Sequence, residues 1–350
     1  MPGDGRLGRR KMWRRASMLV AILIVAGISL FYTLNPNPEI PSITFPFGAH
    51  DLCFDRSGKL LMIVHDSVID VWNVETGNQV ATIDARPQQI TTLTLDKERA
   101  LGCFGTDAGE IGIFNTRSFE TINRFSIGSE RIFRLAVSAK NQVVLARSFG
   151  SHSRIVQLPG GLVGNLKWDS VTSMAISGDE ELVALNNQLG IAPDELGVRK
   201  LDSLNEENDW KILIPGFDRT VEALSFLGQT HLLAVAQPRQ LSLWDFDANK
   251  EVDRMHFQGI RAMATSDDGI TLVIASYPLT LHIVQTNPLR PVRMMEAIAP
   301  IEAFKDPTVR TLAISPDTKY LAASCYDFAP NGLPGHGKTK VWRLDRLLQK

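Results

Sequence analysis

The feature of this sequence that most restricts its fold is a unit of about 43 residues that recurs seven times. From Gly48 onward, each copy has an alternating apolar run, a short polar turn, a second apolar run, a variable loop and a third alternating run. The turns are rich in Asp, Asn, Ser and Gly, which tight turns favour for their backbone freedom or local hydrogen bonds. The seven turns are residues 55–58, 96–99, 138–141, 177–180, 227–230, 266–269 and 315–318.

The third run of each unit gives an independent count, because it ends near a tryptophan or an equivalent position. The first five spacings between these positions are 40–45 residues and the last is 58. A propeller blade of four antiparallel strands takes about 40–45 residues. The sequence therefore predicts an all-β, seven-bladed β-propeller over residues 42–350. The seven positions are Trp72, Phe114, Val156, Arg199, Trp244, Val284 and Trp342.

Three of the units resemble the repeats of the WD-repeat β-propeller family. The resemblance covers residues 42–350 and is specific for the fold, but it points to no subfamily. It is carried by Gly48-Ala49-His50 and Val71-Trp72-Asn73 in the first unit, Leu243-Trp244-Asp245-Phe246 in the fifth, and Ile314-Ser315-Pro316-Asp317 and Val341-Trp342 in the seventh.

Most of the units depart from the pattern of that family. Only the first keeps a histidine, an aspartate and a tryptophan together, at His50, Asp66 and Trp72, while the second keeps Asp107 without the tryptophan. The resemblance implies that Asp66 and Asp107 fix turns and that His50 forms a hydrogen bond within its blade. Because the family's hydrogen-bonded network is mostly missing, we expect apolar packing between blades to contribute more of the stability.

The two ends of the repeat region are expected to meet. The chain ends soon after the third strand of the seventh unit, so that blade lacks its outer strand. Residues 40–47, ahead of the first unit, alternate Ile43, Phe45 and Phe47 as a strand does. We expect this orphan strand to complete the last blade and so remove an exposed sheet edge.

The segment before the propeller is predicted to anchor the chain in a membrane. Residues 16–34 form an apolar stretch of 19 residues without a charge, close to the ~20 that a helix needs to span a bilayer. Residues 1–15 carry six basic side chains against one acidic, and such a tail stays cytoplasmic. After a proline-rich linker at 35–41, the propeller is then extracytoplasmic.

A cleaved secretory signal is the competing interpretation of the same segment. Its apolar run is longer than the usual core of a signal peptide. No clear pair of small residues followed by a plausible mature start stands near its end. The anchor therefore remains the preferred prediction.

Net charge argues against one class of partner, and cysteine spacing argues against disulfides and a zinc site. Without residues 1–15 the chain holds 31 basic and 37 acidic side chains, a net charge of −6, which argues against nucleic acid as the main partner. The three cysteines, Cys53, Cys103 and Cys325, are widely spaced within strand-like segments. We expect buried, inert thiols and neither a disulfide nor a zinc site.

One short motif matches a nucleotide phosphate loop letter by letter, Gly332-Leu333-Pro334-Gly335-His336-Gly337-Lys338-Thr339. That loop works between a strand and a helix, whose N-terminus faces the phosphate. Here residues 340–344 have the pattern of a blade's third strand, and the chain soon ends. We therefore interpret the motif as a glycine-rich propeller loop and expect no nucleotide.

No catalytic, cofactor-binding or metal-binding residue is predicted. The chain has no nucleophile elbow, no zinc-protease motif and no calcium loop, and no histidine pairs with a ligand at metal spacing.

Two insertions, at 188–194 and 328–339, lie between second and third strands and should share one face of the propeller. Insertions on one face often mark a binding surface. The leading hypothesis is a membrane-tethered, non-enzymatic scaffold that binds a protein or a cell-envelope partner.

The alternative hypothesis is an extracytoplasmic enzyme, such as a hydrolase, a lyase or a quinoprotein-like oxidoreductase. It requires carboxylates, histidines or arginines from several blades to converge in the propeller channel. The absence of catalytic motifs makes this the second hypothesis, and an apolar or featureless channel mouth would contradict it.

Overall fold

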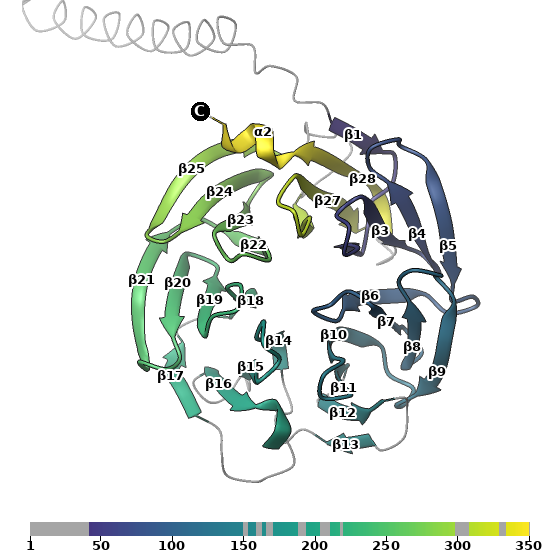
Figure 1. Cartoon of the computed structure of the whole chain (residues 1–350), viewed down its shortest axis with the longest axis horizontal. Helices are drawn as coiled ribbons and strands as arrows, with labels where there is room; N and C mark the ends of the chain where they lie inside the picture. The colour runs from purple at the N-terminus through teal and green to yellow at the C-terminus, as the bar shows by residue number, and fades with distance from the viewer. Residues whose placement is uncertain are drawn as a thin grey trace, which may run out of the picture. The chain divides into compact units, whose positions relative to one another are not determined.

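The computed structural model describes residues 42–149, 153–158, 163–165, 171–187, 194–203, 211–217, 220–297, 308–328 and 334–349. Seven four-stranded antiparallel sheets are arranged around a central axis (Figure 1). The prediction of an all-β, seven-bladed propeller is confirmed.

Each blade holds four strands in chain order from the axis outward, except for the last. Blade 1 has β2 (Asp51–Phe54), β3 (Leu60–His65), β4 (Val68–Asn73) and β5 (Gln79–Asp84). Blade 2 has β6 (Ile90–Leu95), β7 (Leu101–Thr106), β8 (Glu110–Asn115) and β9 (Thr121–Ser126). Blade 3 has β10 (Ile132–Ser138), β11 (Val143–Ser148), β12 (Ser153–Gln157) and β13 (Val163–Asn165).

The remaining blades follow the same plan. Blade 4 has β14 (Val171–Ile176), β15 (Leu182–Asn187), β16 (Asp194–Lys200) and β17 (Lys211–Phe217), with the short 3-10 helix η1 (Leu201–Ser203). Blade 5 has β18 (Ala223–Phe226), β19 (Leu232–Gln237), β20 (Gln240–Asp245) and β21 (Lys250–His256). Blade 6 has β22 (Ile260–Thr265), β23 (Thr271–Ser276), β24 (Thr280–Thr286) and β25 (Leu289–Glu296).

Blade 7 is built from both ends of the repeat region. Its strands run in the order β26 (Val309–Ile314), β27 (Tyr320–Phe328), β28 (Pro334–Arg343) and β1 (Ser42–Phe45). The expected closure by an orphan N-terminal strand is thereby confirmed. Next to this pairing, Thr339 Oγ1 donates to the Phe47 carbonyl at 3.1 Å.

The polar turns form as their sequences predict. In six of the seven first hairpins, a residue with positive φ closes the turn by donating its amide to the carbonyl three residues earlier. Only two of the six are glycines, so side chains must help to hold the others. The six residues are Gly58, Arg99, Gln142, Glu180, Gly269 and Thr318.

The core consists of apolar side chains between adjacent sheets. Phe54 of blade 1 stacks on Tyr320 of blade 7, with ring centroids 6.4 Å apart. In blade 2 the Phe114 ring lies so close to Gly102 that a Cβ there would stand 2.0 Å from it, which explains the glycine. Apolar side chains thus pack tightly within and between the blades.

The cysteines are unpaired and lie within strands, as predicted. Cys103 and Cys325 are buried and Cys53 is partly buried. Burial raises the pKa of the Cys53 and Cys103 thiols to about 12. Both thiols therefore stay protonated and poorly reactive at neutral pH.

The segment 328–339 differs from the loop that we expected. β27 and β28 extend as a long hairpin in which Cys325 pairs with Lys338 and Phe328 pairs with Pro334. Residues 334–339 of the phosphate-loop-like motif therefore belong to a strand, which continues to Arg343. The loop interpretation was wrong for these six residues and for Phe328, while residues 329–333 lie outside the described residues.

The C-terminus also holds an element that the sequence analysis did not anticipate. The short helix α2 (Leu344–Leu348) follows β28 directly and buries Leu344 and Leu347. Arg293 of the outer strand β25 donates to the Leu347 carbonyl at 3.3 Å. The chain end is thus packed against the neighbouring blade 6.

The predicted tail, anchor and linker, residues 1–15, 16–34 and 35–41, lie outside the described residues. Within the part that is described, none of the helices has the length and apolar character that crossing a membrane requires.

The closing strand generates a first prediction. Phe45 is 4% exposed and its ring lies 5.0 Å from that of Trp72 in blade 1. Phe45→Ala should lower the free energy of unfolding by about 3–5 kcal/mol, because it empties a buried aromatic site. Urea unfolding measures the change.

The control for this variant lies in the same strand. Thr44 is exposed, so Thr44→Ala should change stability by less than about 0.5 kcal/mol. Equal losses in both variants would contradict the assignment of this stability to the buried ring.

Candidate functional site

The alternation of strand direction gives the propeller two distinct faces. The turns between first and second strands, such as 55–58, lie on one face, here called the turn face. The connections between second and third strands and those between blades lie on the opposite face, here called the loop face. Both insertions, 188–194 and 328–339, connect a second strand to a third, so the chain enters and leaves them on the loop face. Residues 188–193 and 329–333 lie outside the described residues.

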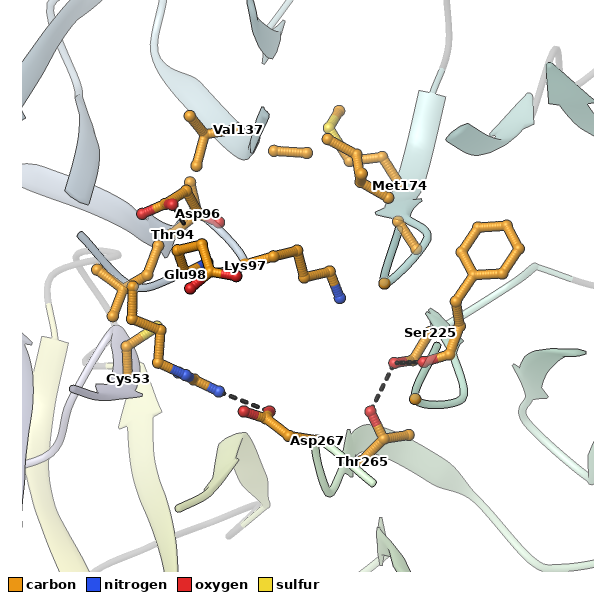
Figure 2. A pocket seen from close by; sticks show the side chains of 18 of the residues that line it. Cys53, Thr94, Asp96, Lys97, Glu98, Val137, Met174, Ser225, Thr265 and Asp267 are labelled. Atoms are coloured by element: carbon orange, nitrogen blue, oxygen red, sulfur yellow. Dashed lines mark hydrogen bonds and ion pairs between the residues drawn. The ribbon is translucent and has the colours of Figure 1, made fainter. Parts of the chain in front are cut away.

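The channel opens on the turn face as a cavity of about 330 Å³. Figure 2 shows the Lys97 side chain extending into it. The ammonium is in contact with solvent, yet the channel walls surround it, and this burial lowers the pKa of Lys97 against the opposing effect of Asp267. No hydrogen bond or ion pair joins Lys97 to another residue in the described part of the chain.

One arginine forms hydrogen bonds between blades at this mouth of the channel. Arg99 of blade 2 donates to the Phe54 carbonyl of blade 1 at 2.7 Å and pairs with Asp267 of blade 6 at 2.9 Å. The side chain therefore connects three blades. Because Arg99 and Asp267 neutralise each other, their role is structural.

The cavity gives limited support to catalysis. Ser225 and Thr265 share a hydrogen bond of 2.7 Å, but no base contacts either hydroxyl among the described residues. A protonated Cys53 at the cavity wall is a weak nucleophile. Lys97 is the lining group whose ammonium extends into the cavity without a hydrogen bond or ion pair among the described residues.

At the loop-face mouth, Asp51 joins three blades. Its Oδ2 accepts from the Leu93 amide at 2.9 Å and from Thr92 Oγ1 at 3.2 Å, both in blade 2. Its Oδ1 accepts from Thr311 Oγ1 of blade 7 at 3.3 Å. Burial raises the pKa of Asp51 although these hydrogen bonds act in the opposite direction.

Arginines and aromatic rings gather beside the same mouth. Phe133 and Phe149 lie 5.7 Å apart, and the guanidinium groups of Arg131 and Arg147 stand 5.4 and 5.5 Å from the Phe133 ring. Phe149 is 66% exposed. Burial, and then the charge of Arg134, lower the pKa of Arg147. We call these five residues the arginine–phenylalanine cluster.

Positive charge continues around the mouth. Glu222 of blade 5 lies 3.7 Å from Arg261 of blade 6. Burial raises the pKa of Glu222, while the charges of Arg261, Arg134 and Arg310 pull it down. Three blades thus direct arginines toward one half-buried carboxylate.

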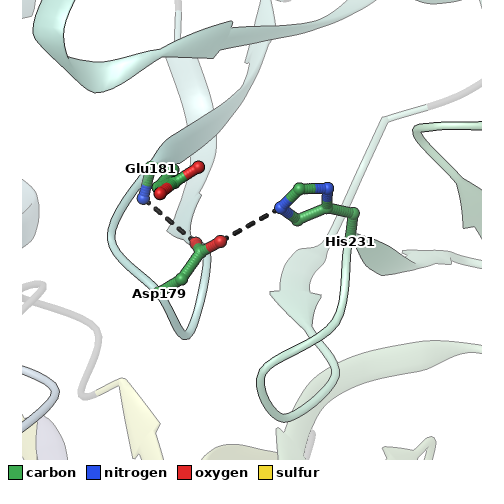
Figure 3. Close-up of side chains that lie close together, drawn as sticks. All are labelled: Asp179, Glu181 and His231. Carbon is green, nitrogen blue, oxygen red and sulfur yellow. Dashed lines mark hydrogen bonds and ion pairs between the residues drawn. The ribbon is translucent and has the colours of Figure 1, made fainter.

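On the turn face, His231 lies between carboxylates of two blades (Figure 3). Its Nδ1 is 2.9 Å from Asp247 of its own blade and its Nε2 is 3.1 Å from Asp179 of blade 4. Hydrogen bonding to Asp247, and less strongly to Asp179, raises the pKa of His231. Donor atoms of Asp179, Glu181 and His231 all lie within 4.8 Å of one another.

The structure places the family-type aspartates and the tryptophan of the first two units as follows. Asp66 has a positive φ of 48° in the turn after β3, and Asp107 accepts from the Gln89 amide at 2.9 Å. The indole N–H of Trp72 is buried without a partner among the described residues. Blade 1 also holds a histidine–aspartate pair that the resemblance did not imply, His65 with Asp70 at 2.8 Å.

The sequence search missed the His231 group because it looked for ligands close together in the chain. Asp179 and His231 are 52 residues apart. Aligning the seven turns would have brought them together, because both belong to the first hairpin of adjacent blades. The arginine–phenylalanine cluster lies within blade 3, on the paired strands β10 and β11 and the residues on either side of them, Arg131 and Phe149.

Comparison with known proteins identifies the fold. No protein-family model and no curated protein sequence matches the chain. Among solved structures, a chain of the mitotic checkpoint complex is similar with a TM-score of 0.68 and 14% identity, over 87% of this chain and 91% of that one. The β-propeller domain of Cps50 (Swd1) from Myceliophteria thermophila is similar with a TM-score of 0.67 and 14% identity, over 87% and 99%.

A third similar structure is Raptor from Chaetomium thermophilum, with a TM-score of 0.69 and 15% identity. The similarity covers 88% of this chain and 29% of Raptor. At these identities the comparisons show a shared propeller fold of WD40 type.

The three-blade contacts of Asp51 generate a second prediction. Asp51→Ala should lower the free energy of unfolding by about 1–3 kcal/mol at pH 7, because it leaves the buried Leu93 amide without an acceptor. Asp51→Asn keeps an acceptor and removes a charge that burial disfavours, so its loss should be clearly smaller. If both variants lose the same stability in urea unfolding, the negative charge itself is required.

The His231 contacts generate a prediction about pH. A histidine whose folded pKa is raised stabilises the fold below its unfolded pKa, near 6.5, and this contribution disappears as pH rises through the folded pKa. With EDTA present, the melting temperature of the wild type should exceed that of His231→Gln at pH 6, and the difference should shrink by pH 9. A difference in melting temperature that stays constant from pH 6 to pH 9 would contradict this prediction.

Proposed function

We propose that the protein is a non-enzymatic interaction module whose loop face binds an acidic segment of a partner protein. The observation that carries the proposal is the arginine–phenylalanine cluster beside the channel mouth. One of the similar chains belongs to the mitotic checkpoint complex, whose name describes an assembly of proteins. This similarity supports a protein as the partner of the present chain.

The chemistry of the cluster suits such a partner. Arginine and aromatic side chains dominate the energetics of protein interfaces, because they combine large contact areas with directional hydrogen bonds. A guanidinium binds a carboxylate through two parallel hydrogen bonds. Arg131 and Arg134 are exposed, and Phe149 presents its ring to solvent beside them.

The two faces also differ in charge. Near the loop-face mouth, five arginines outnumber the carboxylates of Glu130, Glu222 and the half-buried Asp51; they are Arg131, Arg134, Arg147, Arg261 and Arg310. On the turn face, the turns 177–181 and 266–269 carry five carboxylates and no basic residue. An acidic segment is therefore attracted to the loop face and repelled by the opposite one.

The insertions and the membrane anchor complete the proposal. The segments 188–194 and 328–339, which connect second to third strands, would extend the contact surface around the arginine–phenylalanine cluster. The helix 16–34 would tether the module, with residues 1–15 cytoplasmic and the propeller extracytoplasmic. N-terminal sequencing of the protein from its own membranes distinguishes an anchor from a cleaved signal.

The alternative is an extracytoplasmic enzyme with its site in the channel, and Lys97 is the observation that favours it. An amine with a lowered pKa in a cavity of about 330 Å³ can act as a base or a nucleophile. Isolation of a monomer without any partner, together with a reaction lost in Lys97→Met, would support this function instead.

A charge-reversal pair tests the binding face. In mild-detergent purification followed by mass spectrometry, Arg131→Glu combined with Arg134→Glu should reduce the stoichiometric partner at least tenfold, because two attractive contacts become repulsive. Lys250 is exposed on the turn face, so the charge reversal Lys250→Glu should leave the recovery of the partner unchanged. Equal recovery of the partner with all three proteins would contradict a loop-face interface.

A further inference from the structure

Two neighbouring blades present side chains to each other on the turn face. Asp179 and Glu181 lie in and directly after the first turn of blade 4. His231 comes from the first turn of blade 5, and Asp247 follows β20 in the same blade. Figure 3 shows Asp179 between the other two side chains that it labels.

The donor atoms have the spacing of ligands on one small ion. His231 Nε2 and Asp179 Oδ2 are 3.1 Å apart, and Glu181 contributes a carboxylate oxygen within 4.8 Å of both. Ligands at 2.0–2.2 Å from a tetrahedral zinc ion are separated by about 3.3 Å. Small side-chain rotations of Glu181 therefore bring all three donors onto one zinc ion.

Both aspartates hold these donors in position. Asp179 Oδ1 accepts from Ser177 Oγ and from the Glu181 amide, which fixes the carboxylate and leaves Oδ2 turned toward His231. Asp247 places its two oxygens 2.9 and 3.0 Å from His231 Nδ1. Histidines that bind metals commonly donate their second ring N–H to a carboxylate in this manner.

The position of the imidazole also requires a cation. When Nδ1 donates its proton to Asp247, the lone pair of Nε2 faces the Asp179 oxygen. Two acceptors at 3.1 Å repel each other unless a second proton or a metal ion lies between them. The arrangement thus suits a metal ion as well as an imidazolium.

We propose that Asp179, Glu181 and His231 bind a zinc ion that joins blades 4 and 5. One imidazole with two carboxylates is a ligand set that zinc accepts, whereas magnesium and calcium prefer oxygen alone. The side chain of Glu181 is 60% exposed, so the fourth coordination position opens to solvent.

One basic side chain faces the site. Lys140 Nζ lies 3.8 Å from Glu181 and donates to the Asp179 carbonyl at 3.0 Å. Its side chain is 58% exposed, so it can turn into solvent when an ion binds. The Phe246 ring, with its centroid 6.3 Å from that of His231, closes another side.

The test titrates the chelator-treated full-length protein with zinc sulfate in competition with a chromophoric chelator. We expect one zinc ion per chain, with affinity lowered at least tenfold in His231→Gln and in Glu181→Gln. His256→Gln removes an exposed histidine of the same blade and should bind zinc like the wild type. Glu181 is used in preference to Asp179 because Asp179 also holds its turn.

Two further measurements separate a built site from chance binding. Asp247→Asn should weaken zinc binding by about 10- to 100-fold, because it removes the group that orients His231. Cobalt(II) should give the strong visible absorption of a four-coordinate site in the wild type and lose it in His231→Gln. Absence of one-to-one binding, or binding unchanged in both ligand variants, would overturn the proposal and leave an imidazolium between two carboxylates.

Discussion

The ring depends on the pairing of the first strand with the last ones. β1 completes the sheet of blade 7, and Asp51, shortly after it, joins blades 7, 1 and 2 through both carboxylate oxygens. Without this closure, blade 7 would expose an unpaired edge and blade 1 would lose the neighbour against which Phe54 packs. The faces that bear the candidate sites are stable only because the circle of sheets is complete.

The two faces of this circle carry different chemistry. Arginines and phenylalanines from blade 3 surround the loop-face mouth, while carboxylates and one histidine occupy the turns of blades 4 and 5 on the other side. At both mouths polar side chains also hold blades together, as Arg99 does on the turn face and Asp51 on the loop face.

The repeats made the architecture predictable, because turn composition and strand alternation are local properties. The seven turns, the equivalent positions from Trp72 to Trp342, and the closing strand all have the places that the sequence predicts. The hairpin up to Thr339 was misjudged, since glycines and a proline favour a loop until a long partner strand provides hydrogen bonds for them. The His231 group was not predictable in this way, because a contact between blades joins Asp179 to a histidine 52 residues later in the chain. The arginine–phenylalanine cluster was missed because its side chains meet only when β10 and β11 of blade 3 pair.

The closing strand has a consequence for the newly made chain. Thr339 binds the Phe47 carbonyl across 292 residues of sequence, so the first strand of the propeller leaves the ribosome long before its partners. At about 5–20 residues per second, translation of that interval takes roughly 15–60 s. During this time Ile43, Phe45 and Phe47 are exposed on an unpaired strand. A factor that shields nascent chains, or rapid passage through a membrane, would protect it from pairing with the wrong neighbour.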